Sequence, residues 1–108
     1  MEFEYHPQVI QDLFGMADYV AEKTQSKAKG RKRLQQANLL LRKIQQNPNS
    51  GPRLGDGWIV RHNEEDQMIS IVFRPNTAKM TVQIAIVAFG GKDWSTMMHG
   101  RTVFWAQE

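Results

Sequence analysis

Residues 47–52, Asn-Pro-Asn-Ser-Gly-Pro, divide the sequence into two parts with different hydrophobic periods. Before this segment, apolar residues recur at steps of three and four, which is the period of amphipathic helices. After it, they alternate with polar residues or run together in β-branched stretches, which is typical of strands. A helix does not continue through two prolines and a glycine within six residues. The sequence therefore predicts helices first and a sheet afterwards.

Two helices are expected before this break. The first runs from about Pro7 to Lys23, because an apolar stripe recurs there at helical spacing and proline suits a first helical turn. The second carries its apolar stripe over residues 34–44. Residues 24–30 are small and polar and suit a connection, in which Ser26 is a candidate N-cap. Two such helices joined by a short connection are expected to pack antiparallel.

Strands are expected on both sides of the helices. Residues 3–6 alternate between apolar and polar, as in a short half-buried strand, and residues 58–62, 68–73 and 80–89 predict three strands of an antiparallel meander. The predicted fold class is therefore α+β, with the order strand, helix, helix, strand, strand, strand. The helical hairpin is expected to pack on one face of a small, mainly antiparallel sheet, in a single domain over residues 1–108.

The alternation within residues 58–62 predicts which side chains share a face. If Trp58 and Val60 face the helices, His62 shares that side and is expected to be a half-buried structural residue. Arg61 then lies with Ile59 on the open face of the sheet. The tail over residues 93–108 is too apolar for simple disorder, so it either packs on the core or meets a partner, including a second copy of the chain in a homodimer.

Composition excludes several classes of site. The chain has no cysteine, so it has no disulfide and no thiolate ligand or nucleophile. His6, His62 and His99 lack the spacing of zinc sites, and neither a metal nor a cofactor is expected. No apolar stretch reaches the ~20 residues that span a bilayer, and the amino-terminal residues do not resemble a secretory signal. A cytoplasmic protein without a membrane partner is expected.

The positive charge is concentrated in one part of the chain. Eight of the fourteen lysines and arginines lie within residues 23–43, where Glu22 is the only acid from Ala21 to Ile44. Such a cluster suits an anionic partner, although a solvated helix face has the same composition. The candidate partner-binding residues on this element are Lys29, Lys32 and Arg33. Because residues 21–52 contain no aromatic side chain, any nucleic-acid contact here is expected with phosphate and not with bases.

Four cations of the sheet region are candidates for a ribonuclease site if they converge, namely Arg61, Arg74, Lys79 and Lys92. Cleavage by a 2′-hydroxyl needs a proton acceptor, a proton donor and stabilisation of the pentacoordinate phosphate, and a cationic pocket supplies part of this. The four positions are spread along the chain, and the spacing alone does not bring them together.

The stretch AIVAFGGKDW, residues 85–94, ends a predicted buried strand on a loop with a cation and a large ring. Lys92 and Trp94 are therefore candidate partner-binding residues, because tryptophan and basic side chains often dominate binding at interfaces. A structural interpretation is equally physical. In it, the glycines form a tight turn, Asp93 caps a short helix over residues 94–98, and Trp94 fills the edge of the core.

Three segments resemble the ParE/RelE superfamily of bacterial toxins from type II toxin–antitoxin modules. The first is EFEYHPQVIQDLFGMADYV, with the pair Asp12-Leu13 in its helix. The second is NPNSGPRLGDGWIVRH, a proline-glycine bend before a strand that carries Arg61. The third is the loop over residues 90–94. The resemblance covers roughly residues 3–94 and implies a small basic toxin that is neutralised by a cognate antitoxin.

The superfamily divides in function. The long helical hairpin is more similar to the ParE branch, whose members inhibit DNA gyrase and have no known catalytic set. The alternative is a RelE-like endoribonuclease that cleaves messenger RNA on the ribosome with basic side chains on the sheet. A third possibility is a binding module with the same fold and no toxicity. These alternatives remain open at the level of the sequence.

Overall fold

The structure, a computed structural model, describes residues 1–90 and 92–106. Its elements, in chain order, are β1 (Glu2–Tyr5), α1 (Val9–Thr24), α2 (Lys27–Gln46), β2 (Arg53–Gly55), β3 (Trp58–His62), β4 (Ile69–Asn76), β5 (Thr81–Phe89), α3 (Trp94–Thr102) and the 3-10 turn η1 (Val103–Trp105). Within the described part, no helix is both long and apolar enough to cross a membrane.

The five strands form one sheet in the order β1-β5-β4-β3-β2. β1 pairs in parallel with β5, and the other neighbours are antiparallel. The predicted α+β class, the meander and the amino-terminal strand are therefore confirmed. β2 was not predicted, because three residues are too few to establish an alternating pattern.

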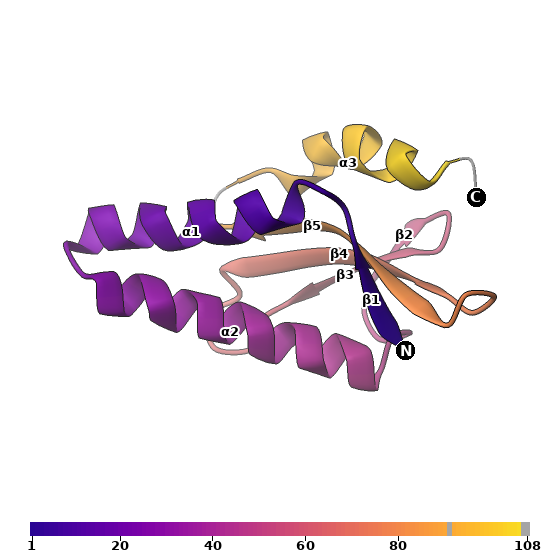
Figure 1. The fold of residues 1–108 in the computed structure, drawn as a ribbon, viewed down its shortest axis with the longest axis horizontal. Helices are drawn as coiled ribbons and strands as arrows, with labels where there is room; N and C mark the ends of the chain where they lie inside the picture. Colours follow the sequence, from indigo (N-terminus) through magenta and orange to yellow (C-terminus); the bar gives the residue numbers. More distant parts are fainter. Residues whose placement is uncertain (91, 107–108) are drawn as a thin grey trace.

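The helices α1 and α2 form the predicted antiparallel hairpin (Figure 1). Ser26 is the N-cap of α2, as predicted, and its hydroxyl accepts a hydrogen bond from the backbone N–H of Lys29 at 3.2 Å. The connection is shorter than predicted, since α2 already begins at Lys27. Gly30 is a buried helical residue where the two helices cross, because a Cβ there would lie 2.6 Å from the carbonyl oxygen of Ala17.

One face of the sheet packs against the hairpin. The buried residues of this layer are Val9, Met16, Ala37, Leu40, Leu41, Ile44, Ile59, Ile69, Ile71, Phe73, Val82, Ile84 and Val87. The apolar stripe of α2 faces the sheet, as the helical period predicts. This layer holds the hairpin on the sheet.

The opposite face of the sheet is covered by α3 and η1, whose side chains pack on the second apolar layer. Figure 1 shows α3 above β5 at the top of the view. Buried Trp105 packs there on Trp58, with ring centroids 5.6 Å apart. The condition on which Arg61 was placed on an open face is not met. Ile59 faces the hairpin, whereas Trp58 and Val60 pack under the tail. The second face is therefore not open, because the apolar tail supplies its missing layer.

Two local features of β4 and β5 differ from the sequence-based expectation. Pro75 lies within β4, paired with Val82, and not in the following loop. It is tolerated because β3 pairs with β4 only as far as Phe73, so the missing N–H removes no ladder bond on that side. In β5 the register shifts between Ile84 and Ile86, which leaves Ala85 as the extra residue of a β-bulge.

Candidate functional site

The four candidate catalytic cations do not converge. Arg74 lies over the ring of Trp58 at 4.4 Å and donates to the side chain of Gln83. Lys79 lies in the turn between β4 and β5, whereas Lys92 follows the other end of β5. The two ends of β5 are paired with the two ends of β4, and the eight residues of β4 span roughly 23 Å at the rise of a strand.

Arg61 is also separated from these cations. It shares a face of β3 with Ile59, so it lies on the hairpin side of the sheet, whereas Arg74 contacts a ring of the α3 side. His62 is exposed, contrary to expectation, and its Nδ1 lies 2.8 Å from the hydroxyl of Ser70. The described residues therefore bring together no set of cations and base for attack on a phosphodiester.

The predicted partner-binding residues lie in three different environments. Lys29 and Lys32 are exposed near the tip of the hairpin. Arg33 is held within the protein, because it forms an ion pair with Asp66 at 2.5 Å and lies over the ring of Phe89 at 5.1 Å. Lys92 and Trp94 follow the carboxy-terminal end of β5.

The structural interpretation of the segment after β5 is confirmed for Asp93 and Trp94, whereas Gly91 of the expected glycine turn lies outside the described residues. Asp93 caps α3 by accepting a hydrogen bond from the backbone N–H of Ser95 at 3.0 Å. Trp94 is half-buried and packs on the apolar layer beneath α3. The helix continues to Thr102, four residues further than predicted. Lys92 remains exposed beside this cap.

A groove of about 800 Å³ lies beside Lys92, between α1, the free edge of β5 and α3. One face of α1 forms its long wall, with Gln8, Gln11, Asp12, Gly15, Met16 and Tyr19. The remaining lining residues are Met68, Val87, Phe89, Gly90, Lys92 and Arg101. These residues come from four separate segments, so only the fold brings them together.

The groove exists because β1 is shorter than β5. β1 pairs with β5 only as far as Ile84, and in the described part of the chain no strand continues along that side of β5. Side chains satisfy the edge instead. Val87 donates its backbone N–H to Asp12 Oδ2 at 3.1 Å, and the carbonyl of Ala85 accepts from Arg101 Nη1 at 2.8 Å.

Asp12 and Arg101 also bind each other. The guanidinium donates to both carboxylate oxygens, at 2.7 and 2.8 Å, and both side chains are less than a tenth exposed. This bidentate pair fixes α3 to α1 across the end of the groove. Its charges neutralise each other, so the pair gives the groove a rigid polar end and little net charge.

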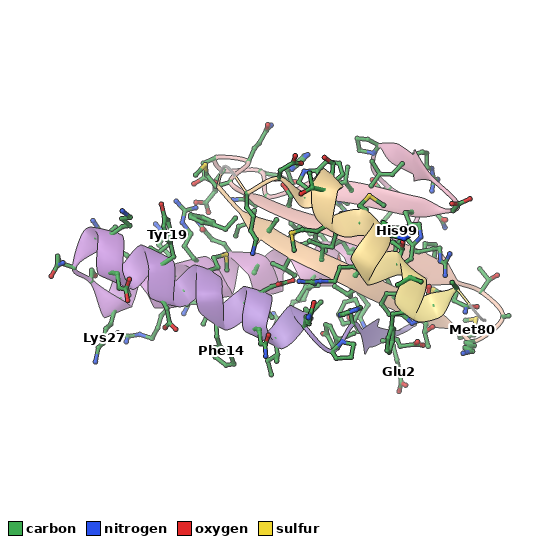
Figure 2. All side chains as sticks on the ribbon, turned by 90° about the horizontal axis from the view of Figure 1, so that it is seen from above. Glu2, Phe14, Tyr19, Lys27, Met80 and His99 are labelled. Atoms are coloured by element: carbon green, nitrogen blue, oxygen red, sulfur yellow. The ribbon has the colours of Figure 1, made fainter. Side chains whose placement is uncertain are left out.

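The other end of the groove is apolar with a cationic rim. The ring of Tyr19 is half exposed and packs against the ring of Phe89 at 6.2 Å, while Met68 is also exposed. Lys23 lies over the Tyr19 ring at 5.8 Å, and Lys92 lines the groove directly. Figure 2 shows Tyr19 and Phe14 on opposite sides of α1. Such a surface suits an extended or helical segment with apolar anchors and carboxylates.

The side chains that line the groove supply apolar contacts and a few charges. The groove contains no histidine, serine or threonine beside a base, and the described residues include no group of three side chains that could hold a metal ion. Only weak signals for the groove are present in the sequence. An aspartate at position 12 and a glycine at position 15 stand out within this amphipathic helix, but neither identified a groove.

Comparison with known proteins supports the fold. No protein-family model matches the sequence, and no curated protein matches it at a significant level. A solved structure described as the chromosomal ParDE TA system from P. aeruginosa contains a chain with a TM-score of 0.69 and 19% sequence identity. The match covers 83% of the present chain and 96% of that chain. The predicted ParE/RelE-like fold is therefore confirmed.

Proposed function

We propose that this protein is the toxin of a type II toxin–antitoxin module, of the ParE-like branch. It inhibits growth by binding DNA gyrase, and a cognate antitoxin neutralises it. The observation that carries the proposal is the fold shared over most of both chains with a chain of a ParDE system. The groove beside α1 supports it independently, because a toxin that is held by an antitoxin needs a preformed docking surface.

In this proposal the groove holds a segment of the antitoxin. Tyr19, Met68 and Phe89 receive its apolar side chains, and Lys92 pairs with a carboxylate at the rim. Trp94 follows Lys92 by two residues, is half-buried and adds an apolar contact to the segment in this proposal. The spread of Arg61, Arg74, Lys79 and Lys92 over the sheet supports an inhibitor that binds a protein over a ribonuclease.

Gyrase inhibition is tested with purified protein in a supercoiling assay on relaxed plasmid. We expect loss of supercoiling at micromolar protein, together with arrested growth when the chain is expressed alone. Primer extension on translated messages provides the second arm. Full supercoiling activity combined with message cleavage would replace gyrase by the ribosome, and normal growth with neither activity would leave a non-toxic binding module.

The docking site is tested with a bulky side chain at Gly15. A Cβ at this position meets no atom within 4 Å, so the Gly15→Trp side chain can enter the groove without a clash between its Cβ and neighbouring atoms. We expect this variant to remain toxic and to escape neutralisation by the product of the adjacent antitoxin gene. Phe14→Trp is the matched control, because Phe14 is exposed on the opposite side of α1 (Figure 2). Equal neutralisation of both variants would place the antitoxin elsewhere.

A further inference from the structure

The tip of the helical hairpin projects beyond the sheet. Phe89, the last residue of β5, contacts Tyr19 of α1 and Arg33 of α2. Residues 20–32 therefore extend past the last strand, by about 9 Å at the helical rise. Figure 1 shows the tip at one end of the molecule, and Figure 2 places Lys27 there, at the end opposite to Met80. We name residues 20–32 the hairpin tip.

The hairpin tip concentrates unpaired cations. Lys27, Lys29, Arg31 and Lys32 are all exposed, and the described residues provide none of them with a carboxylate partner. The rest of α2 differs. The acidic loop between β3 and β4 provides Asp66 for Arg33 and Glu64 for Lys43, the latter at 3.0 Å. The acidic loop therefore pairs with Arg33 and Lys43 of α2, whereas the first turns of this helix carry four exposed cations without a carboxylate partner among the described residues.

This arrangement is unfavourable for the helix itself. Lys27 and Lys29 lie in the first turn of α2, where the helix dipole is positive and favours acidic side chains, and this turn contains none. Lys27 and Arg31 are four residues apart, and Lys29 and Lys32 are three apart, so like charges also repel along the helix surface. Helix stability therefore does not explain these residues, whereas a polyanionic partner would relieve both penalties.

We infer that the hairpin tip binds the phosphate backbone of double-stranded nucleic acid without sequence preference. Phosphate contacts need only lysine and arginine. A protein interface also needs apolar or aromatic anchors in its centre. The hairpin tip contains no aromatic residue, and neither does the rest of the chain as far as Pro52. The same absence removes any platform for stacking single-stranded bases. This function is additional to the groove and does not depend on an antitoxin.

The number of cations predicts the salt dependence of binding. Four phosphate contacts give a slope of about −3.6 for log affinity against log salt concentration. Raising monovalent salt from 50 to 150 mM should therefore weaken binding roughly 50-fold. Each cation removed should make the slope less steep by about 1.

The experiment measures fluorescence anisotropy of a labelled 20-base-pair mixed-sequence DNA duplex, titrated with the full chain. The test variant is Lys27→Gln/Lys32→Gln. The control is Arg42→Gln/Arg53→Gln, which removes the same charge from exposed positions outside the hairpin tip. We expect affinity to fall at least 10-fold more in the test variant than in the control, with a slope less steep by about 2. Equal losses in both variants would overturn the inference, because net charge alone would then explain binding.

Two further arms identify the ligand and control for folding. A duplex RNA of the same length is expected to bind within a few-fold of DNA, whereas polyglutamate of equal charge should compete at least 10-fold more weakly. Competition as strong as that of the duplex would overturn the inference in favour of an acidic protein. The test variant Lys27→Gln/Lys32→Gln should have a urea midpoint at least as high as that of the native chain, because it removes a charge that the helix dipole opposes and like-charge repulsion with Arg31 and Lys29. Loss of duplex binding therefore cannot reflect unfolding, and this result is independent of gyrase inhibition.

Discussion

The buried pair of Asp12 and Arg101 should be strongly coupled in its contribution to stability. Its side chains are 5% and 8% exposed, and together they satisfy the backbone N–H of Val87 and the carbonyl of Ala85. In Arg101→Met the carboxylate loses its counter-charge, and in Asp12→Asn the guanidinium loses its own. Each substitution leaves an uncompensated buried charge, which costs about 3–5 kcal/mol.

The double variant Asp12→Asn/Arg101→Met should be less destabilised than the sum of its parts. It contains no buried charge, and the amide oxygen at position 12 still accepts from Val87. The carbonyl of Ala85 loses its partner, at a cost of about 1–3 kcal/mol. The coupling between the two substitutions should therefore exceed about 2 kcal/mol, which is large for a domain whose total stability is roughly 5–15 kcal/mol.

Urea unfolding followed by tryptophan fluorescence measures this cycle. Trp105 is a buried residue of η1 that packs on Trp58, so its fluorescence reports on the attachment of α3 and η1 to the sheet. Each single variant should shift the midpoint by roughly 2 M, given a slope of about 2 kcal/mol per molar urea. If the two costs add within about 0.5 kcal/mol, the pair is not a coupled unit and does not hold the tail on the hairpin.

Two other predictions concern the glycines of the hairpin and His6. Gly15→Ala should stabilise the protein by about 1 kcal/mol through helix propensity. Gly30→Ala should destabilise it by on the order of 2 kcal/mol, because its Cβ would lie 2.6 Å from the Ala17 carbonyl oxygen. If the thermal midpoints of both variants shift in the same direction, this packing is contradicted. Burial lowers the pKa of His6 below 6.5, so the unfolded chain binds the proton more tightly, and stability should fall as the pH decreases below 6.5 towards the pKa in the folded protein. The urea midpoint of His6→Gln should fall less between pH 7.5 and pH 5 than that of the native chain, whereas the control His99→Gln should behave like the native chain. An unchanged fall in His6→Gln would contradict the assignment of this pH dependence to His6.

The arrangement of the main elements could be predicted from the sequence because each has a strong local signal. The helical stripe over residues 34–44, the break at residues 47–52 and the β-branched runs each determine a local structure. The layer formed by the tail could not be assigned. The strand over residues 58–62 has apolar residues on both faces, so its alternation alone did not indicate which face the hairpin covers.

The candidate groove was beyond sequence reasoning for a different reason. Its polar end joins Asp12 to Arg101, which are 89 residues apart. Its opening depends on the length by which β5 exceeds β1, which depends on pairing and not on composition. Lys92 was identified because it follows a buried strand, but Tyr19 appeared only as part of an amphipathic helix. Local patterns therefore identified one residue at the rim and not the cavity.

The two proposed binding surfaces differ in physics and are therefore separable. The groove joins an apolar wall to a few rim charges, so binding there should depend mainly on buried area and only weakly on salt. The α2 part of the hairpin tip has four exposed cations without a carboxylate partner among the described residues, and the tip has no aromatic anchor, so binding there should weaken steeply with salt. The two surfaces adjoin along α1, since Lys23 at the tip lies over Tyr19 in the groove. A neutralising segment that fills the groove with acidic residues at the Lys23 end should therefore also weaken duplex binding, by reducing the positive potential at the tip. Salt titration of a groove-filled complex would detect this as a smaller slope.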